Sequence, residues 1–233
     1  MSTIVARPAA GPPPATSRLA RVLGSTIGQK LVMAASGAVL SGFVLGHMAG
    51  NLNAFRGAEA IDGYSHMLHA IPEALWAVRL VLLAAVGLHI WAFLALTRRS
   101  RGARPQGYRR SAYRESTYAS RSMRYSGPFL AAFIVYHLLH MTTGTVHPHF
   151  EDGAVHQNLV IGLSVVPVAL FYLAALAALA FHLFHGVWSL FQTLGVGAPR
   201  YESLGRRFAT GFTIVVIGGF AAVPLSVLLG IIR

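Results

Sequence analysis

Five long apolar blocks divide the 233-residue chain, and they constrain its fold more than any other feature. Each block is long enough to form a helix across a bilayer, which takes about 20 mostly apolar residues. Charged residues are only 11% of the chain, whereas soluble domains have about a quarter. The sequence therefore predicts an all-α integral membrane bundle of five transmembrane helices. The expected spans are Leu31–Leu52, Glu73–Thr97, Ser126–Thr145, Asn158–Leu194 and Phe208–Ile232.

The basic residues lie between the apolar blocks. The chain carries a formal net charge of +12, which in a soluble protein would suggest a nucleic-acid partner. Here the charge follows topology instead: the stretch Arg98–Arg124 holds nine arginines against the single acid Glu115. Cytoplasmic loops of membrane proteins are enriched in Lys and Arg. We therefore expect no nucleic-acid partner, and we assign the positive charge to the cytoplasmic face.

The same rule predicts the orientation of every connection. The N-terminal residues 1–24, the Arg98–Arg124 loop and the Arg206-Arg207 loop fall on one side of a five-span chain. The charged residues of the two loops on the other side are mostly Asp and Glu. The N-terminal stretch is rich in Pro, Ala and Ser, a composition typical of disorder. We expect residues 1–24 to form a disordered cytoplasmic arm and residues 25–233 to form the membrane domain.

Cysteine is absent from the sequence. Its absence excludes disulfides, thiolate-ligated iron–sulfur clusters and covalent c-type haem within this chain. A cofactor would need nitrogen or oxygen ligands, and eleven histidines are available. Four of these histidines are embedded in four different apolar blocks: His47, His89, His137 and His182.

The rise of a helix sorts these four histidines by depth, because each residue advances about 1.5 Å along the axis. His47 comes late in an outward-going span and His137 past the middle of another, so both belong to the outer half. His89 and His182 come late in inward-going spans, so both belong to the inner half. Two imidazoles from facing helices at one depth can supply both axial ligands of a haem iron. The pattern predicts one outer and one inner haem.

Glycines accompany the first of these histidines. Gly42, Gly46 and Gly50 form a stripe of small residues at i, i+4 and i+8 around His47. Such a stripe allows another helix, or the flat face of a large cofactor, to approach the backbone. We therefore expect a close approach along this face.

Two other uses of the histidines compete with haem binding. A lone histidine in a membrane helix often hydrogen-bonds a neighbouring helix, and a set of histidines can form the proton relay of a transporter. A relay usually recruits carboxylates as well, and no expected span has an interior Asp or Glu. His140 and His185 follow two of the candidates by three residues, roughly on the same helical face. Spacing alone does not decide which histidine of each couple is the ligand.

Four stretches of the chain resemble one known family. They are STIGQKLVMAASG entering the first span, HMAGNLNAFRGAEAIDGYSHMLHAIP across the first loop, FIVYH in the third span and FHLFHGVWSLF ending the fourth. They resemble the five-helix, diheme cytochrome b membrane anchor of succinate:quinone oxidoreductases, which include fumarate reductases. The likeness extends from about Ser25 to Leu194. It implies that His140 and His185 lie beside the haems and that the axial ligands are His47, His89, His137 and His182.

The resemblance also implies a complex. In that family a flavoprotein subunit oxidises succinate, an iron–sulfur subunit passes the electrons on, and the anchor delivers them to quinone. The chain would hold two b haems, use a quinone such as menaquinone, and perform no dicarboxylate chemistry of its own. It would lie among the lipids of the bacterial inner (cytoplasmic) membrane, and the Arg98–Arg124 and Arg206-Arg207 loops would dock the iron–sulfur subunit. A haem-free structural anchor of the same complex is the alternative.

A quinone head-group needs polar partners near a membrane interface. On the outer side the candidates are Asn51, His66 and His69. On the inner side they are Ser25 and Lys30. Ordinary helix capping and snorkelling at the interface also explain these residues.

Arg79 is a basic residue inside an expected span. It lies ten residues, or about 15 Å, before His89 and therefore near the depth of the outer pair. A guanidinium there can pair with a haem propionate, or it can snorkel to the outer surface. We expect the propionate contact.

Overall fold

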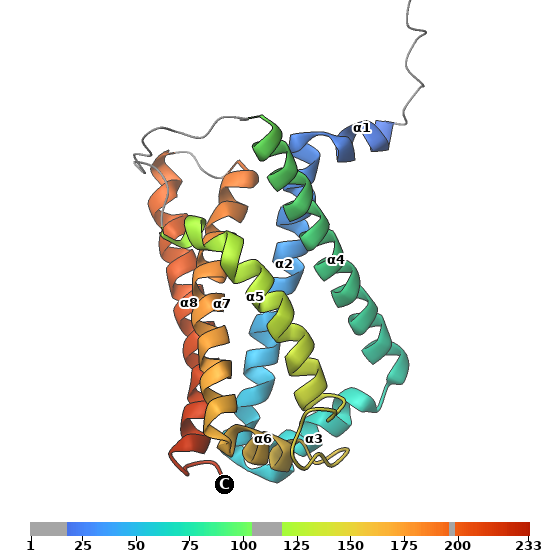
Figure 1. Ribbon diagram of the computed structural model, residues 1–233, viewed down its shortest axis with the longest axis vertical. Helices are drawn as coiled ribbons and strands as arrows, with labels where there is room; N and C mark the ends of the chain where they lie inside the picture. Colours follow the sequence, from blue (N-terminus) through green and yellow to red (C-terminus); the bar gives the residue numbers. More distant parts are fainter. Residues whose placement is uncertain (1–17, 104–117, 196–198) are drawn as a thin grey trace, which may run out of the picture.

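The computed structural model describes residues 18–103, 118–195 and 199–233 (Figure 1). These residues form helices joined by short connections, and no strand occurs among them. The all-α prediction is therefore confirmed for the described part of the chain. In chain order the elements are α1 (Arg18–Gly24), α2 (Thr26–Asn51), the 3-10 helix η1 (Leu52–Arg56), α3 (Ala58–His69), α4 (Pro72–Gly102), α5 (Tyr118–Met141), α6 (Val155–Ser164), α7 (Val166–Thr193) and α8 (Pro199–Leu228).

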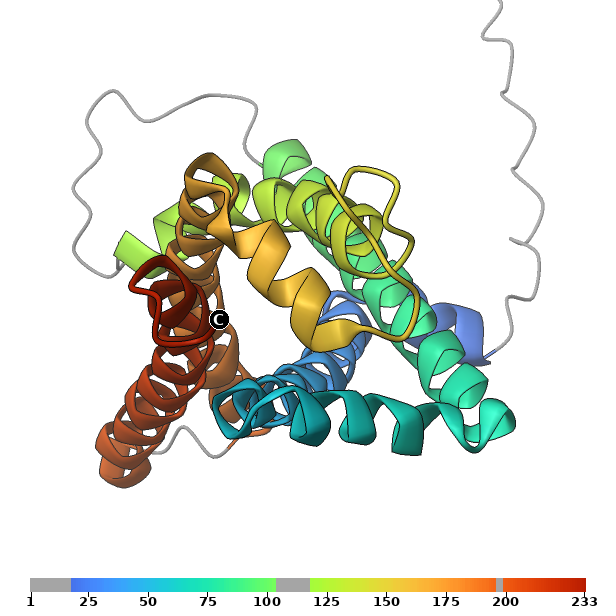
Figure 2. The same ribbon diagram turned by 90° about the horizontal axis from the view of Figure 1, so that it is seen from below.

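The long helices α2, α4, α5, α7 and α8 run along the length of the molecule (Figure 1). The short helices lie across its two ends, with α1 at one end and α3 and α6 at the other (Figures 1 and 2). Helix α7 is central because it packs against α2, α5 and α8, whereas α4 packs on α2. Neither α2 with α5 nor α4 with α7 is among the closely packed helix pairs. Only long side chains can therefore make contact between α2 and α5, or between α4 and α7.

Four stretches are long and apolar enough to cross a membrane: Thr26–Arg56, Pro72–Gly102, Val166–Thr193 and Glu202–Leu228. They correspond to the first, second, fourth and fifth expected spans. Helix α5 covers the third expected span and is not among them. Arg121 and Arg124 lie in its first two turns, and they shorten its apolar part. The described residues thus indicate a multi-pass membrane protein with four candidate spans.

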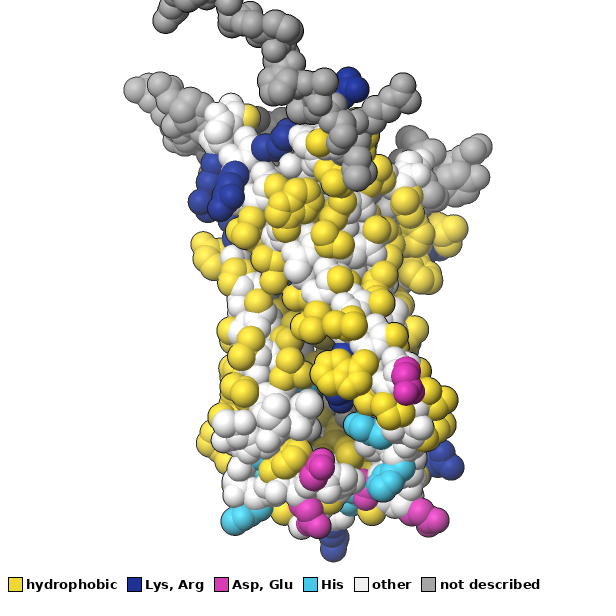
Figure 3. Space-filling model, turned by 90° about the vertical axis from the view of Figure 1, so that its right-hand side faces the viewer, with side chains coloured by type: hydrophobic (Ala, Val, Ile, Leu, Met, Phe, Trp, Pro, Cys, Tyr) yellow, Lys and Arg dark blue, Asp and Glu magenta, His cyan; other side chains and the backbone are white. Residues whose placement is uncertain are grey.

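Charged side chains separate toward the two ends of the long helices (Figure 3). Asp, Glu and His gather at the end that carries α3 and α6, where a few Lys or Arg side chains also lie, and other Lys and Arg side chains lie at the end where α2 begins. We call the end that carries α3 and α6 the acidic end and the end where α2 begins the basic end. Helix α1 forms the last seven residues of the expected N-terminal arm. Residues 1–17 of that arm, and residues 104–117 of the arginine-rich loop, lie outside the described residues.

A proline lies inside α5. The expected span Ser126–Thr145 puts Pro128 in the first turn of its helix, but α5 begins ten residues earlier, at Tyr118. That prediction is wrong, because an interior proline removes one intrahelical hydrogen bond and does not by itself end a helix that packs against a neighbour, as α5 does against α7. The extra turns bring Ser126 into the interior of the molecule, where its side chain is buried.

A break beside a second proline divides the long fourth apolar block. The block Asn158–Leu194 is predicted as one span, but α6 ends at Ser164 and α7 begins at Val166. Val165, between the two helices, has an extended backbone with φ −74° and ψ 101°. Pro167 lies in the first turn of α7, where its missing N–H breaks no intrahelical hydrogen bond. The chain turns at this break, and α6 lies across the acidic end while α7 runs along the bundle (Figure 1).

Side chains hold the connections at the acidic end in place. The Asp62 carboxylate of α3 accepts a 2.8 Å hydrogen bond from the backbone N–H of His156, in the first turn of α6. An anion is favoured at that end of a helix. The Asn158 side chain accepts from the N–H of Glu151 at 2.9 Å and donates to its carbonyl at 2.6 Å. The loop that precedes α6 is therefore fixed against the helix.

Candidate functional site

The structure brings His47 of α2 beside His137 of α5. Their ring centroids lie 5.8 Å apart, with the ring planes at 71°. Phe43 and Phe220 pack on the first ring, and Phe133 stacks on the second. This outer pair lies toward the acidic end and is flanked by apolar rings.

A second pair, His89 of α4 and His182 of α7, lies toward the basic end. Its ring centroids are 6.1 Å apart, with the ring planes at 55°. In both pairs the rings approach one another across two helices that are not closely packed. Helical depth predicts the same grouping of the four residues.

A serine hydroxyl lies beside the ring of His89. Ser36 Oγ lies 3.2 Å from His89 Nδ1 and donates its own proton to the backbone oxygen of Val32, at 2.7 Å. A hydroxyl has one proton, so toward His89 it accepts. In this arrangement Nδ1 is the donor and Nε2 keeps its lone pair. A neutral imidazole in this form can bind a metal through Nε2.

Two further hydroxyls take the same place beside other rings. Ser126 Oγ lies 3.4 Å from Nδ1 of His182, and the Tyr172 hydroxyl lies 3.2 Å from Nδ1 of His137. Metal-binding histidines commonly donate their second ring N–H to such a partner. Sequence reasoning missed these residues and Ser36. The signal for them is a hydroxyl residue within or at the start of an apolar block.

The residue spacing on α5 and on α7 gives nearly the same distance, along the bundle, between the outer and the inner histidine pair. On α5, Ser126 contacts His182 and lies eleven residues before His137. On α7, Tyr172 contacts His137 and lies ten residues before His182. At about 1.5 Å per residue, the pairs lie about 15 Å apart along the bundle. The four imidazoles therefore form two levels, one above the other.

The spacing within each pair matches that of two imidazoles on opposite sides of one metal ion. A metal–nitrogen bond is about 2.0 Å and a ring centroid lies about 1 Å beyond its nitrogen, so such centroids are about 6 Å apart. The observed separations are 5.8 and 6.1 Å. No group of three or more His, Asp or Glu side chains that could hold a metal occurs in the described part of the chain. Two histidines therefore fit a metal that brings its remaining ligands with it, as a porphyrin does.

The neighbouring histidines on each helix have different surroundings. On α5 the ring beside His47 belongs to His137, and on α7 the ring beside His89 belongs to His182. His185, one turn further along α7, is half-buried, and its Nδ1 has no hydrogen-bond partner among the described residues.

His140 belongs to a cluster beside the outer pair. It is fully buried, and its Nδ1 lies 2.9 Å from the Tyr172 hydroxyl. His147 packs on it, with ring centroids 4.9 Å apart. Both ring nitrogens of His147 are occupied, since Nε2 donates to the carbonyl of Asn158 at 2.8 Å and Nδ1 accepts from the N–H of His149 at 3.1 Å. Within residues 18–103, 118–195 and 199–233, Nε2 of His140 finds no hydrogen-bond partner.

The glycine stripe on α2 is used at one position. A Cβ at Gly50 would lie 2.7 Å from the ring of Tyr64, so α3 packs there at a distance that only glycine allows. A Cβ at Gly42 or Gly46 would meet no atom within 4 Å. No helix therefore packs against these two glycines within the described residues.

Arg79 lies over an aromatic ring. Its guanidinium carbon is 5.1 Å from the centroid of Trp76, one turn earlier in α4. Such a cation–π contact is a favourable position for an arginine at a membrane surface. No contact joins it to the outer pair in the structure, so its pairing with a propionate stays a prediction.

The quinone candidates at the outer end have different neighbours. Asn51 donates to the carbonyl of His47 at 2.8 Å, and its side-chain nitrogen also lies 3.4 Å from Nδ1 of that ring. His69 Nδ1 lies 2.8 Å from a backbone oxygen of its own helix, and His66 is exposed. Asn51 is thus the outer candidate that touches a histidine of the two pairs.

At the basic end, the candidates are tied to the start of α2. Ser25 caps this helix by accepting from the N–H of Gly28 at 3.0 Å, which is the structural role that competes with quinone binding. Lys30 is exposed. Its neighbour Gln29 is buried, and the side-chain oxygen of Gln29 has no hydrogen-bond partner in the described ranges.

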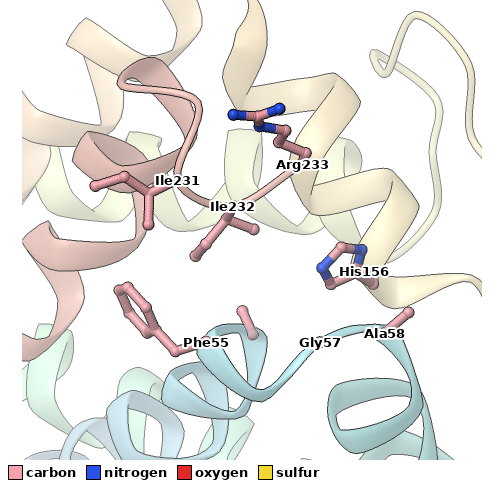
Figure 4. A pocket seen from close by; sticks show the side chains of 8 residues that line it. Phe55, Gly57, Ala58, His156, Ile231, Ile232 and Arg233 are labelled. Atoms are coloured by element: carbon pink, nitrogen blue, oxygen red, sulfur yellow. The ribbon is translucent and has the colours of Figure 1, made fainter.

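A pocket of about 680 Å³ opens at the acidic end (Figure 4). It lies between the start of α3, the start of α6 and the C-terminal residues. None of the four paired histidines lines it. The pocket is therefore separate from the two pairs. Its lining residues are Ala54, Phe55, Gly57, Ala58, His156, Ile231, Ile232 and Arg233.

A family described as "Succinate dehydrogenase/Fumarate reductase transmembrane subunit" matches residues 100–222. The match covers more than half of the chain and includes α5, α6, α7 and most of α8. The chain belongs to this family. Neither a curated protein nor a solved structure matches it.

Membership of the succinate dehydrogenase/fumarate reductase transmembrane subunits makes this chain a membrane subunit of an oxidoreductase complex. Its association with the other subunits of that complex follows. The matched region contains His137 and His182, one histidine of each pair. Their partners His47 and His89 lie on α2 and α4, outside the match. The tertiary structure is what brings the two halves of each pair together.

Proposed function

We propose that this transmembrane subunit is a diheme cytochrome b, which passes electrons from the iron–sulfur subunit through two b haems to a quinone. His89 and His182 would hold the haem nearer the basic end, and His47 and His137 the haem nearer the acidic end. Haem b supplies reversible one-electron transfer between ferric and ferrous iron. The observation that carries the proposal is the spacing of the two imidazole pairs, 5.8 and 6.1 Å between ring centroids.

The protein's own residues would prepare each site for electron transfer. The Nδ1 atoms of His89, His137 and His182 lie beside hydroxyls, and with Nδ1 as the donor these contacts would orient the rings and keep Nε2 free for the metal. The phenylalanine rings beside the outer pair would give it an apolar surrounding. Two protein ligands on each iron would leave no open position for oxygen, so the chemistry would be limited to electron transfer.

In this proposal five helices cross the bacterial inner (cytoplasmic) membrane, α5 included, and the basic end faces the cytoplasm. The separation of charge between the two ends supports this orientation. Helix α5 runs beside the four apolar helices and carries His137 at the level of His47. The iron–sulfur subunit and, through it, the flavoprotein subunit would dock at the basic end.

The quinone, such as menaquinone, would bind near the acidic end. Asn51 supports this position, because it contacts the ring of His47 and lies where α2 ends. Arg79 would pair with a propionate of the same haem in place of its present contact with Trp76.

The experiment is a haem count and a reduced absorption spectrum of the purified complex. We expect two b haems per copy of this subunit and a sharp α-band on reduction. His89→Ala or His182→Ala should remove one haem, and His47→Ala or His137→Ala the other, because each variant opens one six-coordinate site. The control His69→Ala, an exposed histidine on α3, should keep both haems.

Each outcome has a distinct meaning. If His47→Ala and His89→Ala abolish the same spectral component, the pairing is wrong. A wild-type complex that assembles without any haem would identify the subunit as a structural anchor.

A further inference from the structure

We infer that Tyr172 is a positioning residue for the outer haem, whose hydroxyl orders a hydrogen-bond chain from His137 to His140 and so keeps His137 in the form that binds iron. The inference rests on the proposed function, because it takes His137 as an iron ligand. It concerns residues that lie outside the pairs themselves.

The Tyr172 hydroxyl lies between two histidines of α5. It is 3.2 Å from Nδ1 of His137 and 2.9 Å from Nδ1 of His140. The two histidines are one turn apart on the same helical face, so one hydroxyl on α7 reaches both. The tyrosine ring is itself held edge-on by Phe133, with centroids 5.0 Å apart, and by Tyr136, with centroids 6.3 Å apart.

The number of protons available allows two arrangements of the hydrogen bonds among His137, Tyr172 and His140. A phenol has one proton to donate and can accept as well. If Tyr172 donates to His137, the ring hydrogen of His137 sits on Nε2 and that nitrogen cannot bind iron. If Tyr172 donates to His140 instead, Nδ1 of His137 is the donor and its Nε2 has a free lone pair. An acceptor at His140 therefore selects the iron-binding form of His137.

The surroundings of His140 keep that acceptor in place. The ring is fully buried and is stacked on Tyr136, with centroids 5.4 Å apart. On another side Gly162 of α6 approaches so closely that a Cβ there would lie 2.7 Å from His140 Cε1. The ring cannot turn without disturbing these neighbours, so Nδ1 stays directed at Tyr172.

The hydrogen-bond chain should affect the reduction potential of the outer haem, which can be measured. A hydrogen bond from Nδ1 makes an imidazole a more basic ligand, which favours the ferric state. Successive hydrogen bonds in one direction polarise one another and strengthen this effect. Loss of the Tyr172 hydroxyl should therefore raise the reduction potential of the outer haem.

The test is a redox titration of both haems in the purified complex carrying Tyr172→Phe. We expect the ferric-to-ferrous equilibrium of the outer haem to shift about tenfold toward ferrous, or about 59 mV for a one-electron couple. The inner haem should not change. The matched control is Tyr136→Phe, which removes the same atom one residue before His137. The Tyr136 hydroxyl has no hydrogen bond among the described residues, so this variant should leave both potentials unchanged.

Two variants of His140 provide an independent readout if Tyr172→Phe does not assemble. His140→Asn keeps an acceptor oxygen near the position of Nδ1 and should retain the wild-type potential. His140→Leu removes the acceptor and should raise the potential of the outer haem alone. The low-spin ferric EPR signal of that haem depends on the orientation of the His137 ring. It should shift in Tyr172→Phe and in His140→Leu.

Unchanged potentials in Tyr172→Phe, or in His140→Leu, overturn the inference and leave the two-haem proposal standing. An equal shift in Tyr136→Phe overturns it as well, because the effect would then not belong to the hydrogen-bond chain. A wild-type complex without haem overturns the proposed function itself.

Discussion

Replacement of Gly162 by alanine should destabilise the acidic half of the molecule. A Cβ at this position would lie 2.7 Å from Cε1 and 2.9 Å from Nε2 of His140, and 2.8 Å from Nε2 of His147. These rings cannot retreat freely, since His147 is held by the Asn158 carbonyl and His140 by Tyr172. Overpacking of this kind costs about 1–3 kcal/mol. If His140 turns away, its lost hydrogen bond adds about 1 kcal/mol.

The sum of about 2–4 kcal/mol sets the size of the expected effect. A protein of this length loses roughly 2–4 °C of thermal midpoint per kcal/mol, so Gly162→Ala should unfold about 4–16 °C below the wild type. The assay is thermal unfolding of the purified complex in detergent, with the absorption band of the proposed outer haem followed in parallel. Gly218→Ala is the control, because a Cβ there meets no atom within 4 Å. A midpoint within about 1 °C of the wild type would refute the reasoning, because both histidine rings would then have moved aside without lowering the free energy of unfolding.

Two further predictions concern the ends of the molecule. Arg207 is exposed at the basic end, whereas its neighbour Arg206 already pairs with Glu202 at 3.3 Å. Charge reversal by Arg207→Glu should weaken attachment of the soluble subunits about tenfold at moderate salt without changing the haem spectrum, and Arg56→Glu at the acidic end should not. Sedimentation of the complex at rising salt measures this, and full retention of the subunits by Arg207→Glu would count against a docking role. The second prediction is that an uncoupler accelerates succinate:quinone activity in proteoliposomes to which no potential is applied. Each electron that crosses makes the acidic side more negative, so turnover builds a potential that costs the next electron about 2.3 kcal/mol per 100 mV, and α7 has no carboxylate for a compensating proton route. If the uncoupler does not change the activity, the quinone binds at the basic end or a proton route exists elsewhere.

The sequence by itself determined the features that depend on local composition and helical rise. An apolar block must form a helix in a membrane, because no other structure satisfies its backbone within a short segment. The position of a histidine in such a block gives its depth, since the rise per residue is constant. The grouping of His47 with His137, and of His89 with His182, was therefore within reach of the sequence. The same local reasoning was wrong about Pro128, because α5 continues through this proline and packs against α7.

Only the tertiary structure decided which faces of the helices meet. His137 and His140 differ by about 60° around α5 and about 4.5 Å along it, and composition does not reveal which one faces α2. The rotation of each helix is set by packing, which here brings the ring of His137 to His47 and the hydroxyl of Tyr172 between the two α5 histidines. The serine and tyrosine partners come from helices distant in the chain, so no local pattern could join them to their imidazoles. Depth along a helix is a property of one segment, whereas contact between side chains is a property of the whole bundle.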